Sequence, residues 1–468
     1  MGDTDDKKRP LHPIEGSKSG PRLLLHCADG CVPYLNPNQL EEHFPPSGNT
    51  DLWLGLAVRD ACVAPIFNSP SQSDKGERRK KRKSKPNGSN ETANAAAKIN
   101  KVRGYTFAAT SPDPWLLPYT RLTVPSFGTE QRDSITNFSG SKCTNNSVHV
   151  WTPHGRQKLT ADLYATASLE GLQSQHTLSL FDDFDEEEFS RRRKQKALSR
   201  NDQWFQHLLS KDDALLANEG ACKKGKSLLW KPILLPHNVE TSDSEDKTTT
   251  SFAPLPQPDI SKPFPSGLAF VGRWRPDIQL NTIMDTAHLD RVRWKAILTT
   301  RSLSEILEFA TAGVANVIGT NLPQKWAKEK LGFGLDLSSI KLGIEERDPK
   351  RQKIESVETK PGSPAYNATV TDTLLLNKDG CMDLSDKKYA RDTRPLVPGC
   401  DSFVCKDNRF SRAYIHHLVV AKEMLAEILL FGHNLHCLLK LLRCFDCDES
   451  KRKEAMDFIL RQLPSCQN

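Results

Sequence analysis

One stretch of the chain alternates between apolar strand-like runs and a capped helix, and this alternation limits the possible fold class most. Residues 295–299 and 314–319 are apolar runs typical of buried strands, and they flank a helical pattern over residues 302–312. Ser302 and Glu305 form a capping box at the start of that pattern, and the glycine that follows it is a stop signal. A strand, a helix and a strand at this spacing predict a βαβ unit, so we expect an α/β fold with a parallel sheet.

Further elements are expected before this unit. Apolar runs at residues 23–26, 52–64 and 267–271 predict buried strands. A helix is predicted over residues 160–169, with Thr160 as its N-cap, because a threonine hydroxyl can accept a hydrogen bond from the first helical turn. Strand signals therefore occur in both halves of the chain.

The length and composition fit a folded core that carries insertions. The 468 residues suffice for one large α/β barrel or for two to three ordinary domains. Hydrophobic residues make up 37%, below the globular average, and the chain has 30 prolines. Polar stretches near residues 67–101, 238–263 and 345–370, and a charged tail over residues 1–19, are therefore predicted to be disordered.

A basic block lies inside the first of these insertions. It consists of Arg78, Arg79, Lys80, Lys81, Arg82, Lys83 and Lys85. Such a block is most often a solvated loop, and a nucleic-acid-contacting or nuclear-targeting role is the alternative. The net charge of +7 permits a nucleic-acid partner without requiring one, since this short run accounts for much of it.

The use of cysteine indicates the cellular compartment. The chain has 12 cysteines, but its N-terminus carries no apolar segment typical of a secretory signal. No run of 18 or more apolar residues occurs, so no membrane-spanning helix is expected. The cysteines are interpreted as reduced thiols or metal ligands in a cytoplasmic protein rather than as a disulfide framework.

Cys400, Cys405 and His433 form the main candidate site. The two cysteines lie in one tight turn, a helix is predicted from about residue 412 to residue 431, and His433 follows at its end. Two thiolates from a turn and an imidazole from a helix end can converge on one zinc ion, which needs four nitrogen or sulfur ligands. Spacing alone leaves a second interpretation open, in which unrelated cysteines and histidines share a helical segment, since a C-x-x-C pair is missing.

The residues around this site extend the pattern. They read KYARDTRPL at 388–396, PGC at 398–400, SRAYIHHL at 411–418 and HNLH at 433–436. This segment resembles the C-terminal structural zinc segment of the queuine tRNA-ribosyltransferases, which form the tRNA-guanine transglycosylase family. In that family a C-x-C-x-x-C motif is followed by a histidine. Cys400 and Cys405 fall on the first and third cysteines, and two extra residues between 406 and 410 bring His433 onto the family's histidine.

Ser402 departs from the family pattern, because it stands where the second cysteine is expected. A serine hydroxyl is a poor zinc ligand beside a thiolate, so the affinity for zinc should fall. Three interpretations follow: zinc held by three protein ligands, a fourth ligand recruited from Cys437 or His436, or a packed turn without zinc. His416 and His417 are interpreted as surface and packing residues of the helix.

The resemblance also implies the fold. The stretch SVHVWT at 147–152, with GRQKLT at 155–160, is similar to the accessory subunits of the family. Their fold is a (β/α)8 TIM-like barrel. It is expected here over residues 20–440, with a zinc segment at 388–436 and a helical tail at 441–468. The short strands that precede the first barrel strand in this family are not recognisable, which leaves closure of the barrel at that end open.

The family's catalytic residues are missing from this sequence. The resemblance implies a nucleophilic aspartate in a G-V-D-x-F-D-x-x-x-P stretch, which forms a covalent intermediate with the ribose. Residues 313–323 read GVANVIGTNLP, so that Ile318 stands in place of the nucleophile and Ala315 in place of the other aspartate. No carboxylate lies in this stretch. Asp182 and Asp183 are expected to lie in a solvated acidic run without a catalytic role.

A non-catalytic accessory subunit is the function that the resemblance implies. It would pair with the catalytic subunit through the region around the zinc segment and bind tRNA. The pair would exchange guanine for queuine at the wobble position of tRNAs with GUN anticodons. Phosphate contacts are considered at Arg412, at Lys422, at residues 191–194 and at the basic block, although each is more often solvated charge.

Two other functions remain open from the sequence. One is an active transglycosylase with a displaced nucleophile, which Ile318 disfavours. The other is a zinc-containing RNA-binding scaffold that has left tRNA modification. The expected location is the cytoplasm, and the resemblance implies that part of the pool associates with the mitochondrial outer membrane.

Overall fold

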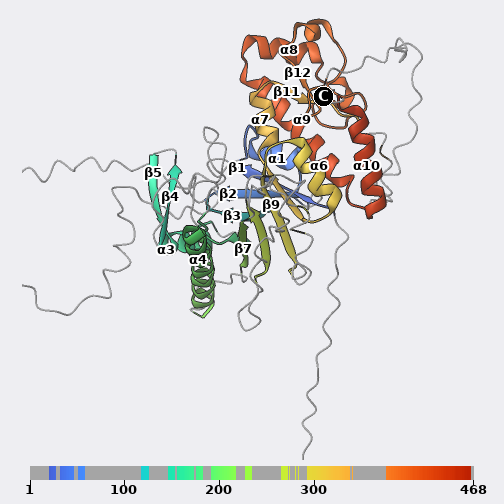
Figure 1. The fold of residues 1–468 in the computed structure, drawn as a ribbon. Coiled ribbons are helices and arrows are strands. Elements are labelled where there is room, and N and C mark those ends of the chain that lie inside the picture. Colours follow the sequence, from blue (N-terminus) through green and yellow to red (C-terminus); the bar gives the residue numbers. More distant parts are fainter. Residues whose placement is uncertain are drawn as a thin grey trace, which may run out of the picture.

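A computed structural model describes most of the predicted elements (Figure 1). It covers residues 20–27, 32–46, 51–57, 118–125, 146–152, 155–172, 175–182, 191–217, 227–234, 265–271, 292–337 and 376–464, together with residues 274, 280, 283 and 340. The charged tail over residues 1–19 and the basic block lie outside the described residues. The three polar insertions do so as well, and their predicted disorder stays a prediction.

Eight parallel strands form a closed barrel in the described part of the chain. In sequence they are β1 (Arg22–Cys27), β2 (Leu52–Ala57), β3 (Thr120–Val124), β6 (His176–Leu178), β7 (Leu228–Leu234), β8 (Gly267–Val271), β9 (Trp294–Thr300) and β10 (Val317–Thr320). β1 pairs with both β2 and β10, and this pairing closes the ring. The expected TIM-like barrel is confirmed, and its closure, which the sequence left open, is achieved by β1 itself.

Aromatic side chains fill the barrel near the N-terminal ends of its strands. The rings of Trp53 on β2 and Trp294 on β9 lie 5.0 Å apart although β1 and β10 separate these strands in the sheet, so both rings face the interior. His176 and Trp230 join them, and the indole Nε1–H of Trp230 donates to Nδ1 of His176 at 3.0 Å. Arg22 lies over the ring of Trp294. These side chains fill the interior of the barrel at the N-terminal ends of its strands.

The predicted βαβ unit is present. It consists of β9, α6 (Leu303–Ala312) and β10, and its second strand begins at Val317 rather than at residue 314. The Ser302 hydroxyl accepts the backbone N–H of Glu305 as predicted, while the Glu305 carboxylate accepts the N–H of Arg301 at 2.7 Å. Gly313 ends the helix with φ +66°, a conformation that favours glycine.

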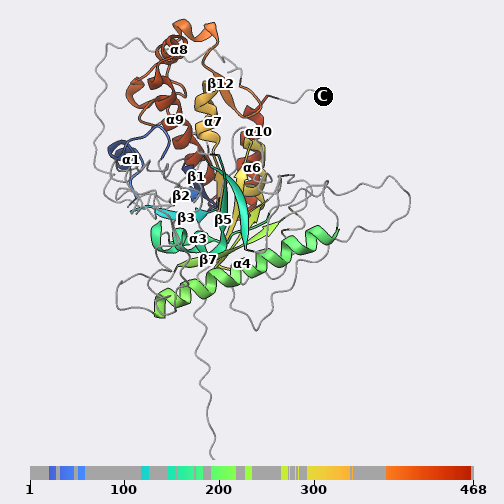
Figure 2. The same ribbon diagram turned by 90° about the vertical axis from the view of Figure 1, so that its left-hand side faces the viewer.

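The remaining elements of the barrel region cover its outside. They are α1 (Pro37–His43), the hairpin of β4 (Ser147–Thr152) with β5 (Gly155–Thr160), α3 (Ala161–Thr166), α4 (Arg191–Ala217) and α7 (Leu322–Lys328). The predicted N-cap of α3 is confirmed, because the Thr160 hydroxyl accepts the N–H of Leu163 at 3.2 Å. Figure 2 shows α4 as a long helix on the side of the barrel away from the C-terminal helices.

The C-terminal part forms a compact unit on the barrel. It contains β11 (Leu331–Phe333), β12 (Cys381–Asp383), α8 (Arg412–Ala421), α9 (Met424–Arg443) and α10 (Glu449–Gln462). α9 packs against α7, and α10 packs against α6, so the unit rests on the last two helices of the barrel. The long apolar helix α9 has the length and composition of a membrane span, but most of it is buried, as in the core helix of a folded domain.

The predicted single helix over residues 412–431 is wrong. Lys422 takes a left-handed conformation with φ 58° and ends α8, and the N–H of Glu423 donates to Leu418 O at 2.9 Å. This is a helix C-terminal motif that does not require glycine but is usually marked by it. Because α9 restarts at Met424, His433 lies in the middle of a helix and not at its end.

Arg412 is a structural residue and not a phosphate contact, which corrects a second expectation. Its side chain is buried, and its guanidinium lies 3.0 Å from the carboxylate of Asp392 and donates to Leu396 O at 2.9 Å. The guanidinium of Arg394 donates two further hydrogen bonds to the same carboxylate, and its backbone N–H donates a third. Asp392 therefore ties the segment before the candidate site to the start of α8.

Acid should weaken this connection. Burial raises the pKa of Asp392, but the hydrogen bonds from Arg394 and the charge of Arg412 outweigh it and lower the pKa to about 2. A carboxyl with a depressed pKa stabilises the fold above its unfolded value and loses this contribution as the pH falls toward its folded value. We expect Asp392→Asn to lower the free energy of unfolding at pH 7 by about 2.5 kcal/mol or more.

Urea denaturation of the two proteins at a series of pH values measures this difference. The difference in the free energy of unfolding should narrow by about 2.5 kcal/mol as the pH falls from about 5 to about 1. Glu449→Gln, on the exposed side of α10, is the control and should change stability little at any pH. A difference between wild type and Asp392→Asn that is independent of pH would contradict the role of the Asp392 charge.

Candidate metal centre

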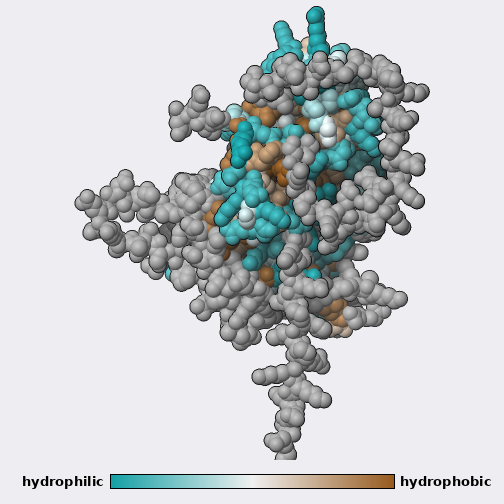
Figure 3. All heavy atoms as spheres, turned by 90° about the vertical axis from the view of Figure 1, so that its right-hand side faces the viewer, coloured by the Kyte–Doolittle hydropathy of each residue, from teal (hydrophilic) through white to brown (hydrophobic). Residues whose placement is uncertain are grey.

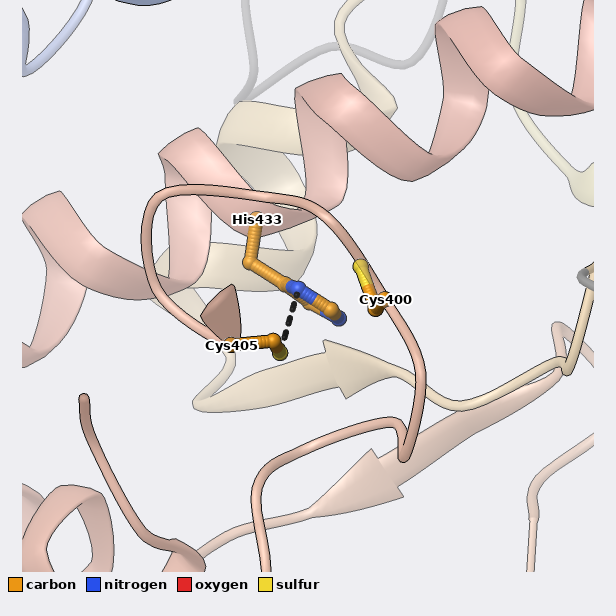
Figure 4. Close-up of side chains that lie close together, drawn as sticks. All are labelled: Cys400, Cys405 and His433. Atoms are coloured by element: carbon orange, nitrogen blue, oxygen red, sulfur yellow. Dashed lines mark hydrogen bonds between the residues drawn. The ribbon is translucent and has the colours of Figure 1, made fainter. Parts of the chain in front are cut away.

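A loop and a helix bring Cys400, Cys405 and His433 together (Figure 4). The cysteines lie on the loop before α8, and His433 projects from α9. The two sulfurs and a ring nitrogen of His433 all lie within 4.8 Å of one another. Sγ of Cys405 is 3.5 Å from Nδ1 of His433. The geometry expected of three ligands to one ion is therefore present among the described residues.

Hydrogen bonding fixes the orientation of the His433 ring. Its Nε2 lies 2.9 Å from the backbone oxygen of Phe333, and since a carbonyl can only accept, Nε2 carries the proton. Nδ1 of this tautomer is then an acceptor, and it faces the sulfur of Cys405 and the hydroxyl of Ser402. Metal-binding histidines are commonly held in this way by a carbonyl on their other nitrogen.

Asn434 continues the same connection to β11. Its side-chain oxygen accepts the N–H of Phe333 at 2.8 Å, and its side-chain nitrogen donates to Leu331 O at 3.0 Å. Both His433 and Asn434 are fully buried. Nothing in the sequence pattern pointed to β11, because the segment that pairs with α9 lies about a hundred residues away.

Ser402 lies inside the cluster at the place of the family's second cysteine. Its hydroxyl is 3.2 Å from Nδ1 of His433 and accepts the N–H of Cys405 at 3.3 Å. The side chain is buried. The serine thus stabilises the turn between the two cysteines.

The two alternative fourth ligands lie in different surroundings. Sγ of Cys437 lies 3.9 Å from Sγ of Cys400 and 3.8 Å from Nδ1 of His433. His436, by contrast, makes a 3.1 Å contact with the carboxylate of Asp401, which also contacts Lys440. Asp401, His436 and Cys400 form a second, more exposed group with ligand atoms within 4.8 Å.

The donor set suits a soft divalent cation. Hydrogen bonds from the thiols of Cys405 and Cys437 hold the pKa of Cys400 far below its usual range. The Cys400 thiolate and burial in turn raise the pKa of Cys405 and of Cys437. Without a cation, one thiolate therefore opposes the ionisation of its neighbours. A cation with affinity for sulfur and imidazole, such as Zn²⁺, removes that opposition, so these residues fit zinc.

The barrel site lacks the family's nucleophile. Arg22, which lies over Trp294 inside the barrel, pairs in register with Val317, so Val317 belongs to an inward-facing row. Side chains alternate along a strand, and Ile318 therefore faces the surrounding helices, where it is fully buried. The same alternation turns Gly319 inward, and a Cβ there would lie 3.3 Å from Nε2 of His26.

Asp182 is buried and paired, which corrects the expectation of a solvated acidic run. It lies after β6, is fully buried, and forms an ion pair with Arg200 on α4. Its backbone N–H donates to the side chain of Asn201 at 2.7 Å. The sequence did not indicate this pair, because nothing in the pattern of α4 distinguishes Arg200 from the other basic residues of that helix. Asp183 lies outside the described residues.

Comparison with known proteins agrees with the resemblance. The family model described as "Queuine tRNA-ribosyltransferase" matches residues 362–445, which include the candidate metal centre. The chain is 26% identical over 299 residues to queuine tRNA-ribosyltransferase accessory subunit 2 of Anopheles gambiae, covering 62% of this chain and 58% of that protein. The resemblance inferred from the Cys/His segment is therefore confirmed.

Shorter stretches match other relatives at higher identity. The accessory subunit 2 of Homo sapiens is 51% identical over 53 residues, 11% of this chain and 12% of that protein. A queuine tRNA-ribosyltransferase of Fusobacterium nucleatum is 42% identical over 69 residues, 15% of this chain and 18% of that protein. The chain thus spans less than two thirds of the length of these relatives.

Proposed function

We propose that the protein is the non-catalytic subunit of a heterodimeric queuine tRNA-ribosyltransferase. It supports the exchange of guanine for queuine at the wobble position of tRNAs with GUN anticodons, in the cytoplasm. The similarity to accessory subunits of that name supports the assignment. Association with the mitochondrial outer membrane stays a prediction from the resemblance.

The stretch that aligns with the family's nucleophile motif carries the non-catalytic part of the proposal. Ile318 has no group that can attack a ribose carbon, and it is buried against the helices of the barrel. Asp182 does not supply a substitute, because Arg200 neutralises it inside the protein. The stretch from Gly313 to Pro323 contains no Asp or Glu. These features favour a subunit that leaves the chemistry to a partner.

Zinc has a structural role in this proposal. Cys400 and Cys405 of the loop and His433 of α9 would hold it, and the ion would cross-link the loop to the helix. His433 is in turn fixed to β11 through Phe333. The loop, α9 and β11 therefore form one scaffold around the metal centre.

An exposed apolar patch lies at the corner between α8 and α9. It consists of Val420, Met424 and Leu425, which lie within six residues of one another and have exposed fractions of 63%, 70% and 38%. Clustered exposed apolar side chains are typical of protein interfaces. Figure 3 shows the face on the α10 side, where the described surface is largely hydrophilic. We infer that the catalytic subunit docks on the α8–α9 corner, close to the metal centre.

Base exchange on tRNA tests this function. Purified chain incubated with tRNA and labelled guanine should give no incorporation, whereas adding a catalytic subunit should restore it.

Met424→Lys, in the middle of the patch, should weaken binding of the catalytic subunit by about tenfold or more, since central apolar contacts contribute most to an interface. The measurement is the dissociation constant of the purified pair.

Leu460→Lys provides the matched control, because Leu460 is 47% exposed on α10, away from the patch. It should leave the dissociation constant unchanged. Incorporation of guanine by the chain alone would contradict the non-catalytic assignment. Failure to bind any catalytic subunit would favour the alternative of a zinc-containing RNA-binding scaffold. Of the residues considered for tRNA contacts in the sequence, Lys422 and Arg192 are exposed in the described part of the chain.

A further inference from the structure

We propose that Cys437 is the fourth ligand of the metal centre and that it replaces the cysteine that the family has at Ser402. The inference rests on the proposed zinc site and adds a residue that the motif spacing does not contain. The resulting set is Cys400, Cys405 and Cys437 with His433. The fourth ligand would then come from the helix instead of the loop.

Two of the three separations from Cys437 to the other ligands are close to the edges of a zinc tetrahedron. Zn–S bonds of about 2.3 Å and Zn–N bonds of about 2.0 Å imply sulfur–sulfur edges of about 3.7 Å and sulfur–nitrogen edges of about 3.5 Å. Sγ of Cys437 lies 3.9 Å from Sγ of Cys400 and 3.8 Å from Nδ1 of His433. The edge from Cys405 to Nδ1 of His433 is 3.5 Å.

Helix geometry explains why Cys437 is within reach. Residues four apart on a helix lie on the same face, so Cys437 stands one turn beyond His433. Both side chains are buried. At Gly432 the loop approaches the helix closely, since a Cβ there would lie 2.4 Å from the ring of Phe403. This close approach brings the loop sulfurs to the level of His433 and Cys437.

The partners of Cys437 and Ser402 differ in a way that favours the cysteine. Within the described residues, the sulfur of Cys437 has only Cys400 and His433 as hydrogen-bonding partners, so it has no competing role. The Ser402 hydroxyl accepts the N–H of Cys405 and can keep that bond when a metal is present. A thiolate is also a far better ligand for zinc than a hydroxyl.

One movement is required for the metal to bind. Sγ of Cys437 also lies 3.6 Å from Nε2 of His433, so it stands beside the ring rather than in front of Nδ1. The cysteine side chain must rotate toward the loop sulfurs to complete the tetrahedron. Rotation about the Cα–Cβ bond is the movement that this requires, because the backbone of α9 already holds Cys437 on the face that carries His433.

Cobalt substitution of the full-length reduced protein tests the proposal. The visible bands of Co²⁺ report tetrahedral coordination, and the intensity of the near-ultraviolet charge-transfer band rises with the number of thiolate ligands. Wild type should show the intensity of three thiolates. Cys437→Ser should lose about a third of it and should bind Co²⁺ and Zn²⁺ more than about 100-fold more weakly, which exceeds the loss for an outer hydrogen-bonding partner.

Two further variants separate a ligand from a packing residue. Ser402→Ala should leave the spectrum unchanged, whereas adding Ser402→Cys to Cys437→Ser should restore the three-thiolate intensity by supplying the sulfur from the loop. Cys444→Ser changes a buried cysteine outside the cluster and is the matched control. Circular dichroism of each variant checks that it is folded.

The outcomes distinguish the two proposals. A two-thiolate spectrum of wild type that Cys437→Ser leaves unchanged would overturn the role of Cys437 and leave the zinc site standing. Loss of metal in Ser402→Ala would overturn it as well, because the hydroxyl would then be the ligand. Failure of reduced wild type to bind either ion would overturn the zinc site itself.

Discussion

Replacing Ile318 with aspartate, the residue that the family's motif has at this position, should destabilise the barrel without creating an active transglycosylase. Ile318 is fully buried on the face of β10 that packs against the helices. The variant loses the apolar contacts of isoleucine and must bury a carboxyl group without a partner. We expect the free energy of unfolding to fall by roughly 4 kcal/mol or more. Urea denaturation measures this loss.

Ile318→Val is the matched control for this substitution. It keeps the shape and polarity of the side chain and removes one methyl group, so it should cost only about 1 kcal/mol. Guanine exchange should be absent in both variants, since the barrel interior near position 319 is filled by His26 and Leu24. A stable Ile318→Asp protein that incorporates guanine would contradict both the orientation of Ile318 and the non-catalytic assignment.

Removing Arg200 should produce the second large effect. Its guanidinium forms a buried ion pair with Asp182, whose side chain is fully buried. In Arg200→Ala the carboxylate loses its charged partner inside the protein. Breaking a buried pair in this way costs about 3–5 kcal/mol, because the remaining charge cannot be solvated. The change in the midpoint of urea denaturation measures the cost.

Two comparisons test the cause. Lys231→Ala breaks a more exposed pair with Asp202 and should cost less than about 1 kcal/mol. The double variant Asp182→Leu with Arg200→Met removes both charges and should recover much of the stability lost in Arg200→Ala. Equal losses in the single and double variants would show that packing and not the charge is decisive.

The local structure of the βαβ unit could be predicted because its signals lie within a few residues of one another. The hydroxyl of Ser302 caps α6, and Gly313 ends it with a positive φ, as the sequence indicates. The barrel itself could be inferred only from the family resemblance. Its closure depends on the pairing of β1 with β10, which joins residues nearly three hundred positions apart.

The convergence of the three candidate ligands was predictable from the sequence, but the residues that hold them in place were not. Cys400, Cys405 and His433 converge as their spacing and the resemblance led us to expect. The helix boundary was wrong because Lys422 ends α8 in a left-handed conformation without the usual glycine. The burial of Arg412 and of Asp182 was missed because each pairs with a residue whose position depends on tertiary packing.

The contacts that α9 makes with β11 have a consequence for solubility. Within the described residues, β11 and β12 form a two-stranded sheet, so each strand has an edge that could pair with another chain. On β11 that edge is occupied, since Asn434 bonds to the N–H of Phe333 and to Leu331 O, and His433 bonds to Phe333 O. These side chains take the place of a third strand. The helix that carries a metal ligand thereby also prevents this edge from joining strands of other molecules into aggregates.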